Sequence, residues 1–184
     1  MDPTNPYRSP QSDLAAAAGA DTTHPLDPGG RFTRLSWFAW NMILGLAVLL
    51  LVLALMAAGL VAIPDAGSAA APAMSLGVLA MDVAFVVLGV LLAIRRLHDM
   101  NASGWWAALL IAPLVNVIVL LVLAFTRGSE GANRFGPPRP TRGWEKVLGI
   151  LYIVLIAAGF VGGILVAIAI PAYMDYMQAA SGTP

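Results

Sequence analysis

Four long apolar segments constrain this chain more than any other feature of its sequence. They span residues 37–63, 74–94, 105–125 and 147–170, and together they contain one ionised side chain, Asp82. Each segment has about the 20 residues with which a helix, rising about 1.5 Å per residue, crosses a hydrocarbon core of about 30 Å. Since 59% of all residues are hydrophobic and 11% are charged, the chain is predicted to be an all-α, polytopic helical membrane protein with three or four transmembrane helices.

Composition excludes several functional classes. The chain has ten Lys and Arg residues and ten Asp and Glu residues, so it has no net charge that would attract nucleic acid. It has no Cys and only two His, which excludes disulfides and thiolate metal sites and leaves too few ligands for a metal cage. We therefore expect no nucleic-acid partner, no metal, no cofactor and no catalytic set. The N-terminus lacks a signal peptide, so the first apolar segment is expected to direct insertion.

The positions of Lys and Arg bear on orientation, because cytoplasmic loops of membrane proteins are enriched in these residues. They occur before the first apolar segment, in 95–104 and in 126–146, and none occurs in the loop after the first segment. If all four segments cross fully, the cations are divided equally between the two sides. If 105–125 is re-entrant, bent at Pro113 and Asn116, all cations and the N-terminus lie on one side, the cytoplasm. The distribution favours the second alternative slightly, and both stay open.

A polar corner separates the second and third apolar segments. It contains cationic, acidic and aromatic residues: Arg95, Arg96, His98, Asp99, Trp105 and Trp106. On a continuing helix, Arg95 would meet both His98 and Asp99, and Arg96 would meet Asp99. The corner is interpreted as an interfacial anchor with an aromatic belt, or as a site for an anionic headgroup or a partner's acidic residue. Catalysis is favoured least, since neighbouring helix residues point about 100° apart.

The connector between the third and fourth apolar segments is rich in Gly, Pro and Arg. It contains Asn133 and Arg134, which we include in the same lipid or partner site. The connector is not a phosphate-binding P-loop, because it lacks the Gly-Lys-Ser/Thr sequence and follows no strand. Its Gly residues are expected to form tight turns that fold the connector back on residues 95–99.

Asp82 is expected about 12 Å along its helix, near the centre of the bilayer. An ionised carboxylate there would cost about 2.5–3.5 kcal/mol, so we expect Asp82 to face the protein. The favoured interpretation is a neutral carboxyl bonded to Asn116, to Asn41 or to a backbone carbonyl. The alternative is a proton or cation relay.

The last apolar segment contains a G-x-x-x-G pair, Gly159 and Gly163. Such pairs let two helix backbones approach closely. We expect them to pack against another helix of the same chain, with homodimerisation as the alternative.

The motifs around the polar corner resemble those of a known family. They are GRFTR at 30–34, RRLHD at 95–99, SGWW at 103–106, Pro113, and GSEGANRFGP at 128–137. In this order and spacing they resemble the bacterial inner-membrane family called domain of unknown function 805. The resemblance implies a small multi-helix protein of the bacterial cytoplasmic membrane, and it implies no activity, substrate or cofactor.

The resemblance also suggests how the chain is organised. Composition separately predicts a disordered tail over 1–29, because a segment with five Pro, four Asp and few large apolar residues cannot bury enough surface to become ordered. The family-like membrane domain covers about 30–138, an extra transmembrane helix follows over 139–178, and a tail covers 179–184. Residues 149–178 look like the N-terminal helix of type IV pilins without its processing signal.

The function expected from the sequence is an interaction or scaffold protein of the inner membrane. Its partners would be the lipid bilayer, anionic lipids, another membrane protein or a second copy of the chain. The alternative is a small transporter or channel component that uses Asp82. A membrane enzyme that uses His98 and Asp99 is the least favoured hypothesis, since no nucleophile or metal-ligand set accompanies them.

Overall fold

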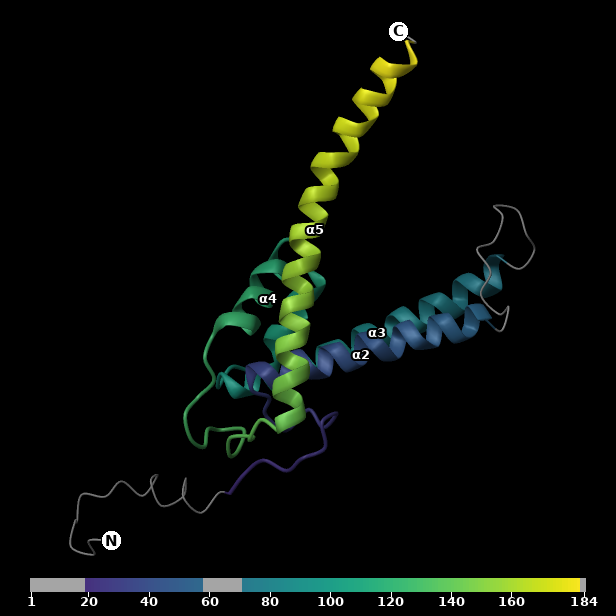
Figure 1. Ribbon diagram of the computed structural model, residues 1–184. Coiled ribbons are helices and arrows are strands. Elements are labelled where there is room, and N and C mark those ends of the chain that lie inside the picture. Colours follow the sequence, from purple (N-terminus) through teal and green to yellow (C-terminus); the bar gives the residue numbers. More distant parts are fainter. Residues whose placement is uncertain (1–18, 58–70, 183–184) are drawn as a thin grey trace, which may run out of the picture.

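The computed structural model describes residues 19–57 and 71–182, with side chains from residue 77 onward in the second stretch. Its helices, shown in Figure 1, are α2 (Arg34–Ala57), α3 (Ala71–Asp99), the 3-10 helix η1 (Gly104–Ile111), α4 (Val115–Phe125) and α5 (Gly143–Ser181). The described residues contain no strand, apart from one isolated bridge between Asn133 and Gly136. The predicted all-α class is confirmed.

Three helices are long and apolar enough to cross a membrane: Arg34–Ala57, Gly77–Asp99 and Gly143–Ser181. Their large apolar side chains are exposed, as at Leu50 (64%) and Phe160 (70%). Such exposure is unfavourable in water and favourable in hydrocarbon, where the helical backbone bonds are already satisfied. The expectation of three or four transmembrane helices is confirmed, with three such helices among the described residues. The α5 helix extends to Ser181, into the segment 179–184 that was expected to be a tail.

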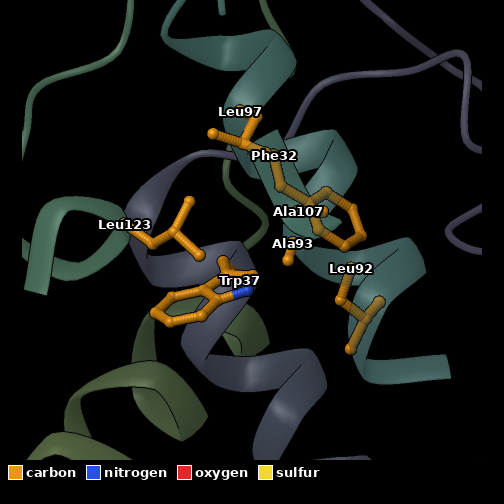
Figure 2. Close-up of a cluster of buried hydrophobic side chains, with 7 residues drawn as sticks. All are labelled: Phe32, Trp37, Leu92, Ala93, Leu97, Ala107 and Leu123. Carbon is orange, nitrogen blue, oxygen red and sulfur yellow. The ribbon is translucent and has the colours of Figure 1, made fainter. Parts of the chain in front are cut away.

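The α2 and α3 helices run antiparallel, so the start of α2 lies beside the end of α3. The backbone N–H of Phe32 donates to the carbonyl of Arg95 at 3.0 Å. A packed apolar cluster lies at this end, as Figure 2 shows; its members are Phe32, Trp37, Leu92, Ala93, Leu97, Ala107 and Leu123. Ala107 of η1 and Leu123 of α4 pack onto the helix pair. The packed core therefore lies at the end of the molecule where the polar residues of the corner gather.

The third apolar segment is divided in two. The first part, η1, ends at Ile111, and after Pro113 the backbone of Leu114 has φ 68°. Asn116 bridges the break, because its Nδ2 donates to the carbonyl of Leu110 at 2.6 Å. The second part, α4, has 11 residues, which give about 16 Å at 1.5 Å per residue, too short for a hydrocarbon core of about 30 Å.

Both ends of this divided segment lie at the polar corner. At its start, a Cβ added to Gly104 would lie 3.2 Å from His98 Nε2. At its end, the carbonyls of Leu123 and Thr126 accept hydrogen bonds from Arg96 of α3. The segment leaves the corner and returns to it, as the re-entrant alternative requires and the full crossing does not.

The α5 helix contacts α2 alone among the described helices. A Cβ added at Gly149 would lie 2.6 Å from the carbonyl oxygen of Leu35, so the two backbones approach closely there. Farther along, α5 runs away from the α2 and α3 pair (Figure 1). An added Cβ at Gly159 or Gly163 would meet nothing within 4 Å. The prediction that these glycines pack against another helix of this chain is therefore wrong for the part that the structure describes, and homodimerisation stays a prediction.

The N-terminal segment is partly packed. Residues 1–18 lie outside the described residues, so the disorder expected there is not tested. From Asp21 the chain lies against the corner: Asp21 is only 9% exposed, and its N–H donates to the carbonyl of Pro138 at 3.3 Å. The expectation of disorder is wrong over 21–29, because polar contacts with Arg95 hold a segment that has no buried apolar side chain of its own.

Candidate functional site

In the folded chain the polar corner of residues 95–106 is joined by residues 21–34 and 126–146, and from here on the name covers all three segments. All Lys and Arg residues in the part of the chain that the structure describes belong to it. Its buried charged and titratable side chains are Asp21, Arg31, Arg95, Arg96, His98, Asp99, Arg139 and Glu145. Because a buried charge is costly unless it is paired and hydrogen-bonded, the partners of each group decide what the corner can do.

Asp99 pairs with two guanidinium groups. Its Oδ1 accepts from Arg31 Nη2 at 2.9 Å and from Nε at 3.2 Å, and its Oδ2 accepts from Arg96 Nη1 at 2.7 Å. A Cβ at Gly128 would collide with this carboxylate, so only glycine allows the loop to pass here. The predicted contact between Arg96 and Asp99 is confirmed. Asp99 joins the end of α3 to the segments before α2 and after α4.

Arg31 fixes the loop after α4. Its Nη1 donates to the carbonyls of Gly131 at 2.7 Å and Gly136 at 3.1 Å. Asn133 Nδ2 donates to the carbonyl of His98 at 2.8 Å. The prediction that this loop folds back on residues 95–99 is confirmed. Arg31 itself was not singled out as a site residue, and its place in the GRFTR motif was the signal available.

Arg96 connects α3 to the end of α4. Its Nε donates to the carbonyl of Leu123 at 2.9 Å, and its Nη2 donates to the carbonyl of Thr126. The last carbonyls of a helix have no partner within the helix and carry a partial negative charge, so a cation is favourable there. Arg96 thereby fixes the return of the divided segment to the corner.

Arg95 is bound by the N-terminal segment 21–30, which we call the strap. Its guanidinium group donates to four acceptors of the strap: the carbonyls of His24 (2.8 Å) and Asp27, Thr23 Oγ1 (3.1 Å) and Asp21 Oδ2 (3.4 Å). Its central carbon also lies 4.4 Å from the centroid of the Phe32 ring, a cation–π contact.

Two expectations for the arginines are corrected by these contacts. Arg95 bonds to acceptors of the strap and to neither His98 nor Asp99 in the described structure. Arg95 and Arg96 are also 0% exposed. Neither guanidinium group is available to a headgroup or partner as long as the strap and the loop stay in place.

Asp21 is the strap's carboxylate. Burial by itself would raise the pKa of Asp21, but hydrogen bonds from the N–H of Arg31 and from Thr23, together with the charge of Arg95, lower this pKa below its ordinary value. The N–H of Arg31 lies 2.8 Å and the Thr23 hydroxyl 2.6 Å from this carboxylate. Asp21 is therefore ionised at neutral pH.

Glu145 joins the starts of α2 and α5. Its Oε1 accepts from Arg139 Nη2 at 2.8 Å and from Trp40 Nε1 at 3.1 Å. Its Oε2 accepts from Ser36 Oγ at 2.8 Å and from the N–H of Arg142 at 3.0 Å. Sequence reasoning missed this site, although an acidic residue in the first turn of a helix was an available signal.

His98 is packed against an aromatic ring. The centroids of His98 and Phe135 lie 3.8 Å apart with an interplanar angle of 8°, and Arg134 lies 4.7 Å from the centroid of the same Phe135 ring. Burial lowers the pKa of His98, although backbone groups of Gly30 and Pro28 act in the opposite direction. Among the described residues, no group of three His, Cys, Asp or Glu residues could hold a metal ion. No hydrogen bond joins His98 to Asp99, so the pair has no dyad geometry in the described structure.

The outside of the corner carries a second set of cations, which we call the rim. Its exposed residues are Arg34, Arg127, Arg134, Arg142 and Lys146. Exposed Trp residues accompany them, since Trp105 is 86% and Trp106 57% exposed. The exposed acids of the described corner, Asp27 and Glu130, are fewer. The rim is therefore both cationic and aromatic.

Asp82 lies away from the corner and is exposed on α3. This exposure shows that the prediction that Asp82 faces the protein is wrong. The two Asn side chains expected as its partners bond elsewhere: Asn41 Nδ2 donates to the carbonyl of Trp37 at 2.8 Å, and Asn116 bonds within the divided segment. The favoured interpretation, a neutral carboxyl bonded to Asn41 or Asn116, therefore has no support in the described structure. The alternative, a proton or cation relay, stays untested.

The fold and the site define a polytopic helical membrane protein whose core and cations gather at one end of three apolar helices. Residues 25–137 match the family described as "Protein of unknown function (DUF805)". Because the match covers more than half of the chain, the chain belongs to the DUF805 family. The resemblance stated for about 30–138 is confirmed, whereas no comparison supports the pilin resemblance over 149–178.

Two relatives come from Escherichia coli (strain K12). "Inner membrane protein YhaI" is 53% identical over 45 residues, which are 24% of this chain and 38% of the relative. "Inner membrane protein YhaH" is 44% identical over 43 residues, which are 23% of this chain and 36% of the relative. This chain therefore spans well under half the length of each relative, and no solved structure matches it. Together with the three apolar helices, the relatives support a multi-pass protein of the inner membrane.

Proposed function

We propose that this protein is a non-enzymatic interaction protein of the bacterial inner membrane, and that its rim binds anionic lipid headgroups on the cytoplasmic side. The observation that carries the proposal is the division of the cations into two sets. The buried arginines bond to acceptors of the chain itself, whereas the rim cations are exposed beside exposed Trp residues. Trp at the headgroup level and cations facing anionic lipid are typical of a membrane interface.

The gathering of the cations at one end supports the proposed orientation. The start of α2, the end of α3 and the start of α5 all lie at the polar corner, and the opposite ends of these helices point away from it (Figure 1). Since Lys and Arg mark the cytoplasmic side, the N-terminus and the polar corner face the cytoplasm. The C-terminal end of α5 then lies on the other side of the membrane.

The experiment compares the stability of the full chain in nanodiscs of phosphatidylcholine with and without phosphatidylglycerol. One variant replaces Arg34, Arg127, Arg142 and Lys146 with Gln. We expect phosphatidylglycerol to stabilise the wild type and to have little effect on this variant, because each cation near an anionic surface contributes about 1 kcal/mol. The difference should shrink in high salt, which screens exposed charges.

The control variant exchanges Arg for Lys and Lys for Arg at the same four positions, so it keeps the charge of the rim. It should respond to phosphatidylglycerol as the wild type does. If the Gln variant and the control variant respond equally, the rim does not bind anionic headgroups. Arg95 and Arg96 are left unchanged in this test, because both are buried and neither belongs to the rim.

A further inference from the structure

The strap is bound to the corner by polar contacts. None of its apolar side chains is buried, and Leu26 is 41% exposed. Besides its bonds to Arg95, it accepts a hydrogen bond from Arg139 Nη1 at the carbonyl of Thr23, at 3.4 Å. A segment held without buried apolar surface can leave while the core stays packed. The strap can therefore open while the core stays packed.

Two arginines lie beneath the strap on one aromatic ring. The guanidinium carbons of Arg95 and Arg139 are 4.4 Å and 5.0 Å from the centroid of Phe32. Arg139 pairs with Glu145 at 2.8 Å, while the one carboxylate paired with Arg95 among the described residues is that of Asp21, at 3.4 Å. If the strap leaves, Arg95 loses its counter-charge.

The two guanidinium groups also have donors left over. The Nε atoms of Arg95 and Arg139 are buried and have no hydrogen-bond partner in the described structure, a costly condition for a charged group. Arg31 and Arg96 differ in this respect, because Asp99 and loop carbonyls use their donors. Unused buried donors therefore occur on the two arginines whose guanidinium groups contact the strap.

The strap presents oxygen atoms to Arg95: one carboxylate oxygen, one hydroxyl and two carbonyls. A phosphate group offers a comparable set of acceptor oxygens with more negative charge, and guanidinium groups bind it through several charge-assisted hydrogen bonds.

We propose that Arg95 and Arg139 form a phosphate-binding site, and that the strap occupies this site as an internal ligand. A phosphate group, from free phosphate or from a lipid headgroup, binds when the strap leaves. This site goes beyond the proposed function, since it uses buried arginines and none of the rim cations. It also assigns a role to Asp21, whose carboxylate takes the place of the phosphate while the strap is closed.

The experiment compares two substitutions in the strap that change the net charge equally. Asp21→Asn weakens the internal ligand while keeping its shape. Asp27→Asn is the matched control, because the Asp27 carboxylate is exposed and accepts from the N–H of Gly29 at 2.8 Å, and its contact with Arg95 is through the backbone carbonyl. Inorganic phosphate is titrated into each full-length protein in an uncharged detergent at constant ionic strength. Calorimetry and the phosphate-dependent rise in unfolding temperature measure affinity.

We expect Asp21→Asn to bind inorganic phosphate about tenfold more tightly than the wild type, since removing a competitor worth about 1.4 kcal/mol has that effect. Asp27→Asn should bind as the wild type does. The double substitution of Asp21→Asn with Arg95→Gln should lose the gain. Equal affinities of the two Asn variants both for inorganic phosphate and for the lipid of the parallel arm, or a gain that survives Arg95→Gln, would overturn the proposal.

A parallel arm identifies the source of the phosphate group. Phosphatidic acid in phosphatidylcholine nanodiscs, without free phosphate, replaces the inorganic ion. A gain for Asp21→Asn in this arm alone assigns a headgroup, a gain in the detergent arm alone assigns free phosphate, and a gain in neither overturns the proposal. When Asp21→Asn is combined with the four Gln substitutions of the rim, the gain in affinity for inorganic phosphate should remain. The result for this site is therefore independent of whether the rim binds anionic headgroups.

A second variant covers the case in which Asp21→Asn does not fold. Thr23→Val changes no charge and keeps the size of the side chain, but it removes the hydroxyl that accepts from Arg95 at 3.1 Å and donates to Asp21 at 2.6 Å. It should therefore displace the strap and raise the affinity for phosphate in the same direction. Displacement of the strap, seen as faster hydrogen exchange over 21–30, without any rise in affinity would contradict the proposal.

Discussion

Asp99→Asn should destabilise the protein more than any other single charge neutralisation at the corner. The substitution keeps the size of the side chain and one accepting oxygen, so the change is mainly one of charge. It removes the carboxylate that Arg31 contacts at 2.9 Å and Arg96 at 2.7 Å. Both arginines are 0% exposed, so water cannot replace the lost partner.

The magnitude follows from the geometry. Removing one partner of a buried ion pair costs about 3–5 kcal/mol, because the other charge stays buried without compensation. Two guanidinium groups depend on Asp99, but each also donates to backbone carbonyls, such as those of Gly131 and Leu123, which remain. We therefore expect the free energy of unfolding to fall by about 3–5 kcal/mol, and not by twice that amount.

The assay is the apparent free energy of unfolding of the full chain in detergent, with helix content as a second readout. Asp82→Asn is the matched control, since it makes the same chemical change on the same helix at an exposed position. It should be neutral or slightly stabilising, because an ionised carboxylate is costly in the apolar interior of a detergent micelle as it is in a membrane. If the two substitutions destabilise the protein equally, Asp99 is not the ion-pair centre that its contacts indicate.

Three further predictions concern the strap, α5 and orientation. Because the folded-state pKa of Asp21 lies below its ordinary value of 3.8, its ion pair stabilises the strap fully above that pH and is lost as the pH falls through the lower folded pKa. The protection of the strap against hydrogen exchange, measured relative to the intrinsic exchange rate at each pH, should fall only there, and a loss of protection near neutral pH would contradict this. Gly149→Val should cost about 1–3 kcal/mol by overpacking α5 against a backbone carbonyl of α2, whereas Gly163→Val, which meets open space, should leave the unfolding midpoint unchanged. Single Cys residues at Ser129 and Ser181 of this Cys-free chain should react with an impermeant maleimide in intact cells only at Ser181, and the reverse result would refute the orientation.

The sequence by itself determined the class of protein and the location of its polar residues. Apolar segments long enough to cross a bilayer need no tertiary information, because the bilayer thickness and the helix rise set the length. The motif residues also showed which segments meet, as with the loop that Asn133 ties to His98. Family membership, too, followed from the RRLHD and SGWW motifs.

Only the tertiary structure decided which partner each charge has and which face of each helix is covered. Helix spacing places Arg95 near Asp99, but it cannot show that the guanidinium group bonds instead to a segment some 70 residues away in the sequence. Pro113 is compatible with a kinked crossing or with a break, and the positive φ of Leu114 and the bonds of Arg96 resolve the choice. Asp82 was expected to face the protein because burial in hydrocarbon is costly. Its exposure depends on how the helices pack around it, and the local sequence does not determine that packing.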